Sequence, residues 1–127
     1  MIATGWQRVE GALVALAGLG IALAVQPGWP WWLWPLILLT PDLAMIGYLA
    51  GPRAGAALYN AAHLYGAALL LAVAGVILGL PLLLAIGGLW LAHIGADRAL
   101  GYGLKSPDGF RLTHLGRIGG GDSQPPG

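Results

Sequence analysis

Residues 81–98 read PLLLAIGGLWLAHIGADR, an apolar run that carries ionisable side chains near its end. The run has the length and composition of a membrane-spanning helix, which needs about 20 mostly apolar residues. His93 and Asp97 are four residues apart, so a helix places them on one face. A charged side chain inside the bilayer costs about 2.5–3.5 kcal/mol on insertion scales. The run therefore predicts both a transmembrane helix and a polar site.

Three further apolar segments precede this run. They cover residues 6–25, 31–50 and 54–78. Pro and Gly occur at every junction, where Pro cannot continue a helix and Gly suits its end. Because the turns are short, consecutive helices should be antiparallel neighbours. The pattern predicts an all-α, integral membrane four-helix bundle of up-down-up-down topology.

The composition also favours a membrane protein. Of the 127 residues, 57% are hydrophobic and 9% are charged, with a net charge of +1. A soluble domain has about 25% charged residues, so this chain has too few to cover a surface in water. The chain has no basic stripe for nucleic acid and no cysteine for disulfides or thiolate metal sites. We expect one membrane domain at 1–118, with a cytoplasmic tail segment at 99–118, and a disordered end at 119–127.

The basic residues predict the orientation. A four-span topology places all six on one side: Arg8, Arg53, Arg98, Lys105, Arg111 and Arg117. Loops in the cytoplasm carry the excess of Lys and Arg, whereas Trp favours the headgroup layer. Tryptophans cluster between residues 29 and 34, at the opposite face. We therefore expect a multi-pass protein of the inner (plasma) membrane with both termini in the cytoplasm.

Two aspartates and two histidines form the candidate site. With about 1.5 Å of rise per residue, Asp42 and His63 lie about 12–13 Å and His93 about 8 Å from the cytoplasmic ends of their helices. Imidazole and carboxylate suit divalent first-row metals, Zn²⁺ among them. We predict Asp42, His63 and His93 as metal ligands. Asp97, at the rim, would be a fourth ligand, orient His93 or act as general base, and His114 of the tail would fold over the site as a second catalytic residue.

The same residues also have structural interpretations. Asp42 follows a proline and is suited to capping a broken helix. His63 is in a position to bond Asn60 or a neighbouring carbonyl, and His93 and Asp97 are spaced to form a structural pair. These alternatives remain open from the sequence.

Several motifs together resemble a known family. They are PDLAMIGYL at 41–49, GA at 55–56, YN at 59–60 with His63, AH at 92–93, DR at 97–98, GYGLK at 101–105 and THLG at 113–116. This pattern closely resembles small bacterial membrane proteins catalogued as domain of unknown function four-two-six-zero. The resemblance extends to Ile118 and implies four spans, with no established activity. Many members have a second histidine after the position of His63, where this chain has Leu64.

A looser resemblance is to membrane-bound predicted metal-dependent hydrolases. Those proteins combine a Pro-Asp pair, a Thr-His pair and a His-x-x-x-Asp pair on hydrophobic helices. The chain has Pro41-Asp42, Thr113-His114 and His93-x-x-x-Asp97, in a different order and at different spacings. The likeness is one of short motifs.

Three functions therefore follow as hypotheses, and the sequence leaves open whether the protein is an enzyme. A small Gly-rich bundle with short loops is typical of a non-enzymatic accessory or structural subunit of a larger membrane complex. The alternative is a metal-dependent membrane hydrolase acting on a lipid or another amphiphile. A third is a haem- or quinone-binding bundle with His63 and His93 as axial ligands. The expected partners are the lipid bilayer and a larger complex or a second copy of the chain, but no nucleic acid.

Overall fold

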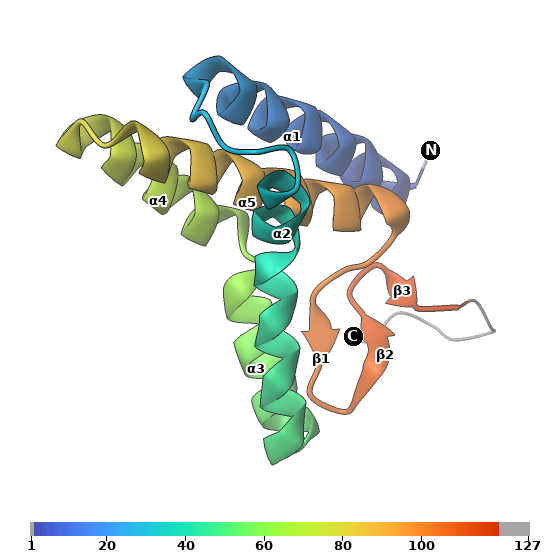
Figure 1. Cartoon of the computed structure of the whole chain (residues 1–127). Coiled ribbons are helices and arrows are strands. Elements are labelled where there is room, and N and C mark those ends of the chain that lie inside the picture. Colours follow the sequence, from blue (N-terminus) through green and yellow to red (C-terminus); the bar gives the residue numbers. More distant parts are fainter. Residues whose placement is uncertain (1, 120–127) are drawn as a thin grey trace.

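A computed structural model describes residues 2–119. Its helical part precedes a small antiparallel sheet of strand order β1-β2-β3 (Figure 1). The helices are α1 (Ala3–Val25), α2 (Leu33–Leu39), the 3-10 helix η1 (Thr40–Ala50), α3 (Pro52–Ala62), α4 (Tyr65–Leu78) and α5 (Pro81–Leu100). The strands are β1 (Lys105–Ser106), β2 (Gly109–Thr113) and β3 (Gly116–Arg117).

The four predicted apolar segments are confirmed. Helical stretches long and apolar enough to cross a membrane cover Ala3–Val25, Leu33–Ala50, Pro52–Leu78 and Pro81–Leu100. Their ends lie within one helical turn of the predicted limits. The protein is therefore an all-α membrane protein, with only a small sheet at the end of its helices.

Two of these segments change course near their middle. The second changes from α2 to the 3-10 helix η1 at Thr40, next to Pro41, whose ring nitrogen cannot donate a helical hydrogen bond. The third is broken after Ala62, where His63 leaves the helical conformation and Leu64 is extended (φ −88°, ψ 129°). The continuous apolar pattern did not predict this second break, which places His63 at the end of a helix.

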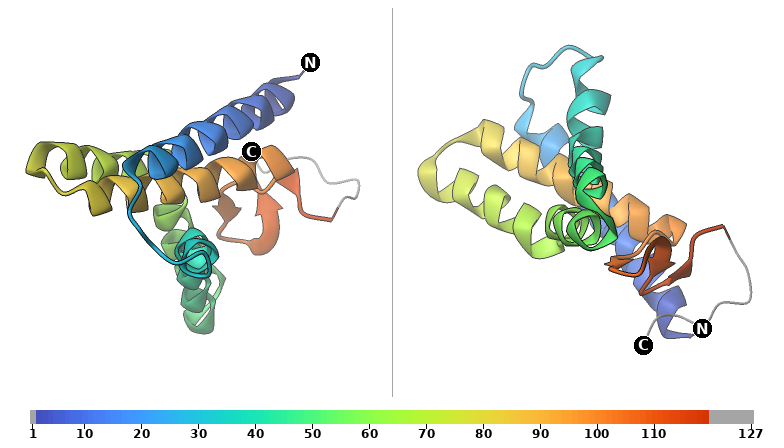
Figure 2. Two further views of the ribbon diagram at one scale, coloured as in Figure 1. Left: turned by 45° about the horizontal axis from the view of Figure 1, so that its top comes forward. Right: turned by 90° about the horizontal axis from the view of Figure 1, so that it is seen from below.

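The helices α1, α5 and α4 lie side by side, and the hairpin of η1 and α3 projects away from them (Figures 1 and 2). Glycines let α1 and α5 approach closely, with Gly11 and Gly18 facing Gly95 and Gly88. A Cβ atom added at Gly88 would lie 2.7 Å from the carbonyl oxygen of Gly18. Consecutive segments pack together in η1–α3 and α4–α5, as predicted, but α1 packs along α5 rather than along α2.

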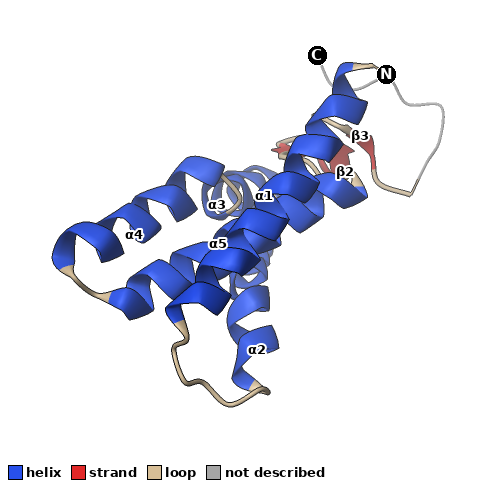
Figure 3. Ribbon diagram, turned by 90° about the horizontal axis from the view of Figure 1, so that it is seen from above, coloured by secondary structure: helices blue, strands red, loops and turns tan. Residues whose placement is uncertain are grey.

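The segment after α5 folds into the sheet, which lies against α3 and near the ends where α1 begins and α5 finishes (Figure 3). Two hydrogen bonds attach the sheet to the Asn60 side chain of α3. Asn60 Nδ2 donates to the carbonyl oxygen of Lys105 (2.9 Å), and Asn60 Oδ1 accepts from the Lys105 N–H (2.6 Å). Of the end predicted to be disordered, 119–127, only Gly119 belongs to the described residues.

Candidate metal centre

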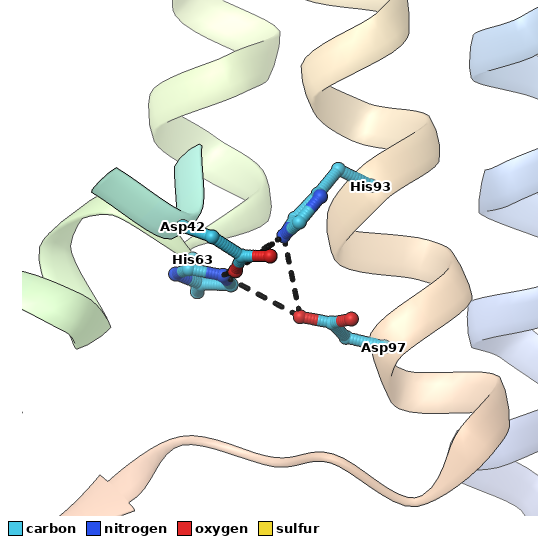
Figure 4. Close-up of side chains that lie close together, drawn as sticks. All are labelled: Asp42, His63, His93 and Asp97. Carbon is cyan, nitrogen blue, oxygen red and sulfur yellow. Dashed lines mark hydrogen bonds and ion pairs between the residues drawn. The ribbon is translucent and has the colours of Figure 1, made fainter. Parts of the chain in front are cut away.

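Four ionisable side chains converge where η1, α3 and α5 meet (Figure 4). Asp42 comes from η1, His63 from the end of α3, and His93 and Asp97 from α5. One donor atom from each lies within 4.8 Å of the other three. The structure thus brings together the four residues that the sequence placed toward one end of three consecutive apolar segments.

The distances within this cluster suit a common ligand ion. His63 Nε2 and His93 Nε2 are 3.1 Å apart, and Asp42 Oδ1 lies 3.3 and 3.0 Å from them. Asp97 Oδ2 lies 3.4 Å from each imidazole nitrogen. A tetrahedral ion with bonds of about 2.0–2.1 Å would hold its ligands about 3.3 Å apart. The cluster is therefore already close to the size of a zinc coordination shell.

The hydrogen bonds of His63 direct a lone pair toward the centre. Its Nδ1 lies 2.8 Å from the carbonyl oxygen of Tyr59, which only accepts, so Nδ1 carries the hydrogen. In the neutral imidazole Nε2 is then unprotonated. Metal-binding histidines usually donate their second nitrogen in this way. The Tyr59 ring also stacks on the imidazole (centroids 3.7 Å apart, planes at 12°) and fixes its plane. Asn60 is occupied with Lys105 instead of His63.

The charges of the cluster also favour a bound cation. With neutral histidines, the carboxylates of Asp42 and Asp97 bring two negative charges next to a fully buried His63 and a nearly buried His93. The two carboxylates are partly exposed, with 38% of the Asp42 and 18% of the Asp97 side-chain surface accessible, but two like charges at one site repel each other. A divalent cation at the centre would neutralise the pair.

The break in the third segment is stabilised by side chains from α5. The end of a helix leaves carbonyl groups without backbone partners. Trp90 Nε1 donates to the carbonyl oxygen of Ala62 (2.6 Å), and Arg98 Nη2 donates to that of His63 (2.8 Å). From the sequence, Arg98 is a topology signal and a candidate partner of Asp97, and Trp90 is not identified. No local pattern marks either, because their acceptors lie on another helix.

Two cavities reach the cluster from different sides. The tail-side pocket, about 280 Å³, is lined by Asp42, Met45, Tyr59, Asp97, Tyr102, Lys105, Phe110 and Ile118. The helix-side groove, about 390 Å³, lies between α1, α2 and α5 and is lined mainly by apolar residues. Asp42 and Asp97 line both cavities, and His93 lines the groove. The centre is thus accessible to a ligand rather than enclosed.

Lys105 is the basic residue of the tail-side pocket and was not predicted as a site residue. Its side chain is nearly buried, with 4% of its surface exposed. Nζ lies 3.9 Å from the Phe110 ring centroid and 4.9 Å from that of Tyr59. Burial lowers the pKa of Lys105 to about 8, against the opposing effect of Asp97 and Asp42. The ammonium group is therefore still mostly charged at neutral pH.

His114 lies apart from the cluster. Its Nδ1 accepts a hydrogen bond from the Leu104 N–H (2.8 Å), and its ring lines a separate small cavity with Glu10, Tyr65 and Arg98. Burial, together with the charge of Arg98, lowers the pKa of His114. The structure does not bring this predicted catalytic residue to the four others.

The imidazole geometry does not suit a haem. Axial ligands on opposite sides of one iron need about 4 Å between their nitrogens, at about 2 Å per bond. The two Nε2 atoms are only 3.1 Å apart, and the carboxylates of Asp42 and Asp97 lie 3.0–3.4 Å from them. This distance is closer to the separation of about 3.3 Å between adjacent ligands of one small ion.

Comparisons with known proteins give a family but no activity. Neither the curated proteins nor the solved structures contain a match. A family model matches residues 4–118, a range that includes the four clustered side chains, the sheet and all of the four apolar segments except Ala3. The protein therefore belongs to the family described as "Domain of unknown function (DUF4260)".

Proposed function

We propose that the protein is a metal-dependent membrane hydrolase that binds a divalent ion, Zn²⁺ or a similar metal, through Asp42, His63 and His93. The observation that supports this is the convergence of their donor atoms, 3.0–3.3 Å apart, with the His63 lone pair directed inward by the Tyr59 carbonyl. Three protein ligands leave a coordination position open, which is typical of catalytic zinc sites.

Asp97 is suited to act as general base. Its Oδ2 lies slightly further from the imidazoles than Asp42 Oδ1 does, and its carboxylate borders both cavities. Held by Asp42, His63 and His93, such an ion would lower the pKa of a water bound to it to about 7. In ester hydrolysis, the water oxygen bonds to the carbonyl carbon and the bond from that carbon to the alcohol oxygen breaks. Asp97 takes the water proton and returns it to the leaving alcohol.

The setting of the centre favours a lipid or another amphiphile as substrate. The helix-side groove is bordered by leucines of α1, α2 and α5, so an apolar chain can reach the centre without crossing water. The end of the helices that carries the candidate site would lie toward the cytoplasm. In support, Arg8 Nε donates to the carbonyl oxygen of Ala99 (2.9 Å), so the start of α1 and the end of α5 share one end with the basic sheet.

A second candidate is the non-enzymatic subunit of a larger complex, with the ion in a structural role. Asp97 Oδ2 is equidistant, at 3.4 Å, from both imidazole nitrogens, as a fourth ligand would be. A site closed by four protein ligands is typical of structural zinc. The role of Asp97 therefore separates the two candidates.

Metal analysis tests the proposal. We expect one zinc per chain in purified protein after zinc titration and loss of zinc in His93→Ala, while His114→Ala keeps it. Asp97→Asn should keep zinc but hydrolyse a panel of medium-chain esters about 10²–10⁴-fold more slowly than the wild type. Zinc release by Asp97→Asn, together with a wild type inactive on every ester, would favour the structural role. A wild type that stays metal-free would overturn both.

A further inference from the structure

The ammonium group of Lys105 is buried but has no hydrogen-bond or ion-pair partner among the described residues. Its backbone is fixed to the Asn60 side chain by two hydrogen bonds, and its ammonium group lies against Phe110 and Tyr59. Among residues 2–119, no hydrogen bond or ion pair reaches Nζ. Burying a lysine without an anionic partner is costly, and contact with aromatic faces offsets only part of that cost. The ammonium group is thus available to a ligand in the tail-side pocket.

The charge of this pocket depends on the metal. Its ionisable lining residues are Asp42, Asp97 and Lys105, together with tyrosines. Without an ion, two carboxylates and one ammonium leave the pocket negative. With a divalent ion the carboxylates are balanced, and the charge of Lys105 makes the pocket positive. A metal-loaded centre therefore attracts an anion on this side.

The other side of the centre is apolar. The helix-side groove is bordered by the side chains Leu16, Leu19, Leu38, Leu39, Ala96 and Leu100. Asp42 and Asp97 form part of both walls, so the four-residue cluster lies between the tail-side pocket, which contains Lys105, and the apolar groove. One ligand can then contact Lys105 at one end, the cluster in the middle and the leucines at the other end.

We propose that the centre takes an anionic amphiphile, with its phosphate or carboxylate head group on Lys105 and its acyl chain in the helix-side groove. This inference rests on the proposed hydrolase. It assigns Lys105 as the residue that selects the head group and places the bond to be hydrolysed between head group and chain, beside the cluster.

Binding of dodecyl phosphate to zinc-loaded protein in a neutral detergent tests the proposal. A hydrogen bond to a charged group contributes enough that Lys105→Met should raise the Kd about 10- to 100-fold. Lys105→Arg keeps the charge and should bind more tightly than Lys105→Met. Arg111→Met, on the exposed part of the neighbouring strand, is the matched control and should leave the Kd unchanged. Removing zinc from the wild type should also weaken binding.

A substitution in the helix-side groove tests the proposed position of the acyl chain. Ala96 lines the helix-side groove and is exposed, so Ala96→Phe should fill the groove and weaken dodecyl phosphate binding about tenfold. Ala17→Phe, on an exposed part of α1 that does not line the groove, should have no effect. Zinc content, measured on every variant, shows that the centre is intact.

The outcomes separate the two proposals. Equal affinity of wild type and Lys105→Met for dodecyl phosphate, or equal affinity of the wild type for dodecyltrimethylammonium, overturns the anionic substrate. If the wild type nevertheless binds zinc and hydrolyses esters, the proposed hydrolase function is still supported. A wild type that binds no zinc overturns the hydrolase itself.

Discussion

At the scale of single residues, the candidate metal centre depends on other side chains that hold its four members in place. His63 ends a helix, and the carbonyls around it are bonded by side chains rather than by a further turn. Arg98 makes several of these contacts. Its guanidinium donates to the carbonyls of His63 (2.8 Å) and Tyr102 (3.0 Å) and lies over the Tyr65 ring. Arg98 thus joins α5 to the break after α3.

Arg98→Met should therefore destabilise the protein. The substitution leaves two carbonyl groups without donors, one of them buried, at a cost of about 1–3 kcal/mol for each buried unsatisfied group. We expect a lower unfolding midpoint in an SDS titration followed by tryptophan fluorescence. Arg117→Met, at an exposed position of β3, is the control and should change the midpoint little. Equal midpoints for both variants would show that Arg98 has no such role.

At the scale of elements, the sheet is held to α3 by the paired hydrogen bonds between Asn60 and Lys105. Further contact comes from Phe110, whose ring meets Tyr48 of η1 edge to face at 5.3 Å. The sheet thereby forms one wall of the tail-side pocket. Its attachment determines whether Lys105 faces the cluster.

Asn60→Ala should release the sheet. Loss of two hydrogen bonds, at about 1 kcal/mol each, raises the population of the detached state about 30-fold. Trypsin should then cleave after Lys105, which is buried in the wild type, at a correspondingly higher rate. Ser106→Ala, which removes only an exposed turn contact with the Asp108 N–H, should leave the rate near that of the wild type.

Acid should loosen the same segment. The pKa of His114 is lowered in the folded protein by burial and by Arg98, so the detached state binds more protons. Attachment is then strongest above the ordinary histidine pKa of about 6.5 and weakens as pH falls below it. Protonation also removes the acceptor for the Leu104 N–H. Hydrogen exchange of that amide, corrected for its intrinsic pH dependence, should accelerate several-fold between pH 7 and 5, and this acceleration should vanish in His114→Gln.

At the scale of the whole molecule, α5 is the central helix, with α1 on one side and α4 on the other. The packing relies on glycines at intervals of seven residues, Gly11 and Gly18 on α1 and Gly88 and Gly95 on α5. A turn position such as Gly51 has a different role, because its φ of 114° favours glycine. This packing positions the two α5 members of the candidate site, His93 and Asp97.

Gly18→Leu should separate α1 from α5. Its side chain would meet backbone atoms of Gly88 and Ala92, which cannot move aside, so we expect a loss of about 3 kcal/mol in SDS unfolding. Gly20→Leu is the matched control on the same helix, because an added Cβ there meets nothing within 4 Å. A Gly18→Leu protein as stable as the control would contradict this packing.

The orientation is also a property of the whole chain, and the absence of cysteine makes it easy to test. Because the basic end should face the cytoplasm, Asp108→Cys should react with a membrane-impermeant maleimide only after cell lysis. Trp31→Cys, at an exposed position near the other end, should react in intact cells. The reverse pattern would invert the proposed topology.

The sequence by itself determined the membrane class, the four apolar segments and the placement of Asp42, His63, His93 and Asp97 toward one end of three consecutive segments, because hydropathy and helical rise are local properties. Only the tertiary structure decided the break at His63, the direction of its lone pair and the place of Lys105 in the pocket. Each of these depends on hydrogen bonds between distant segments, such as Arg98 to His63 and Asn60 to Lys105. No periodic pattern along the chain records such partners.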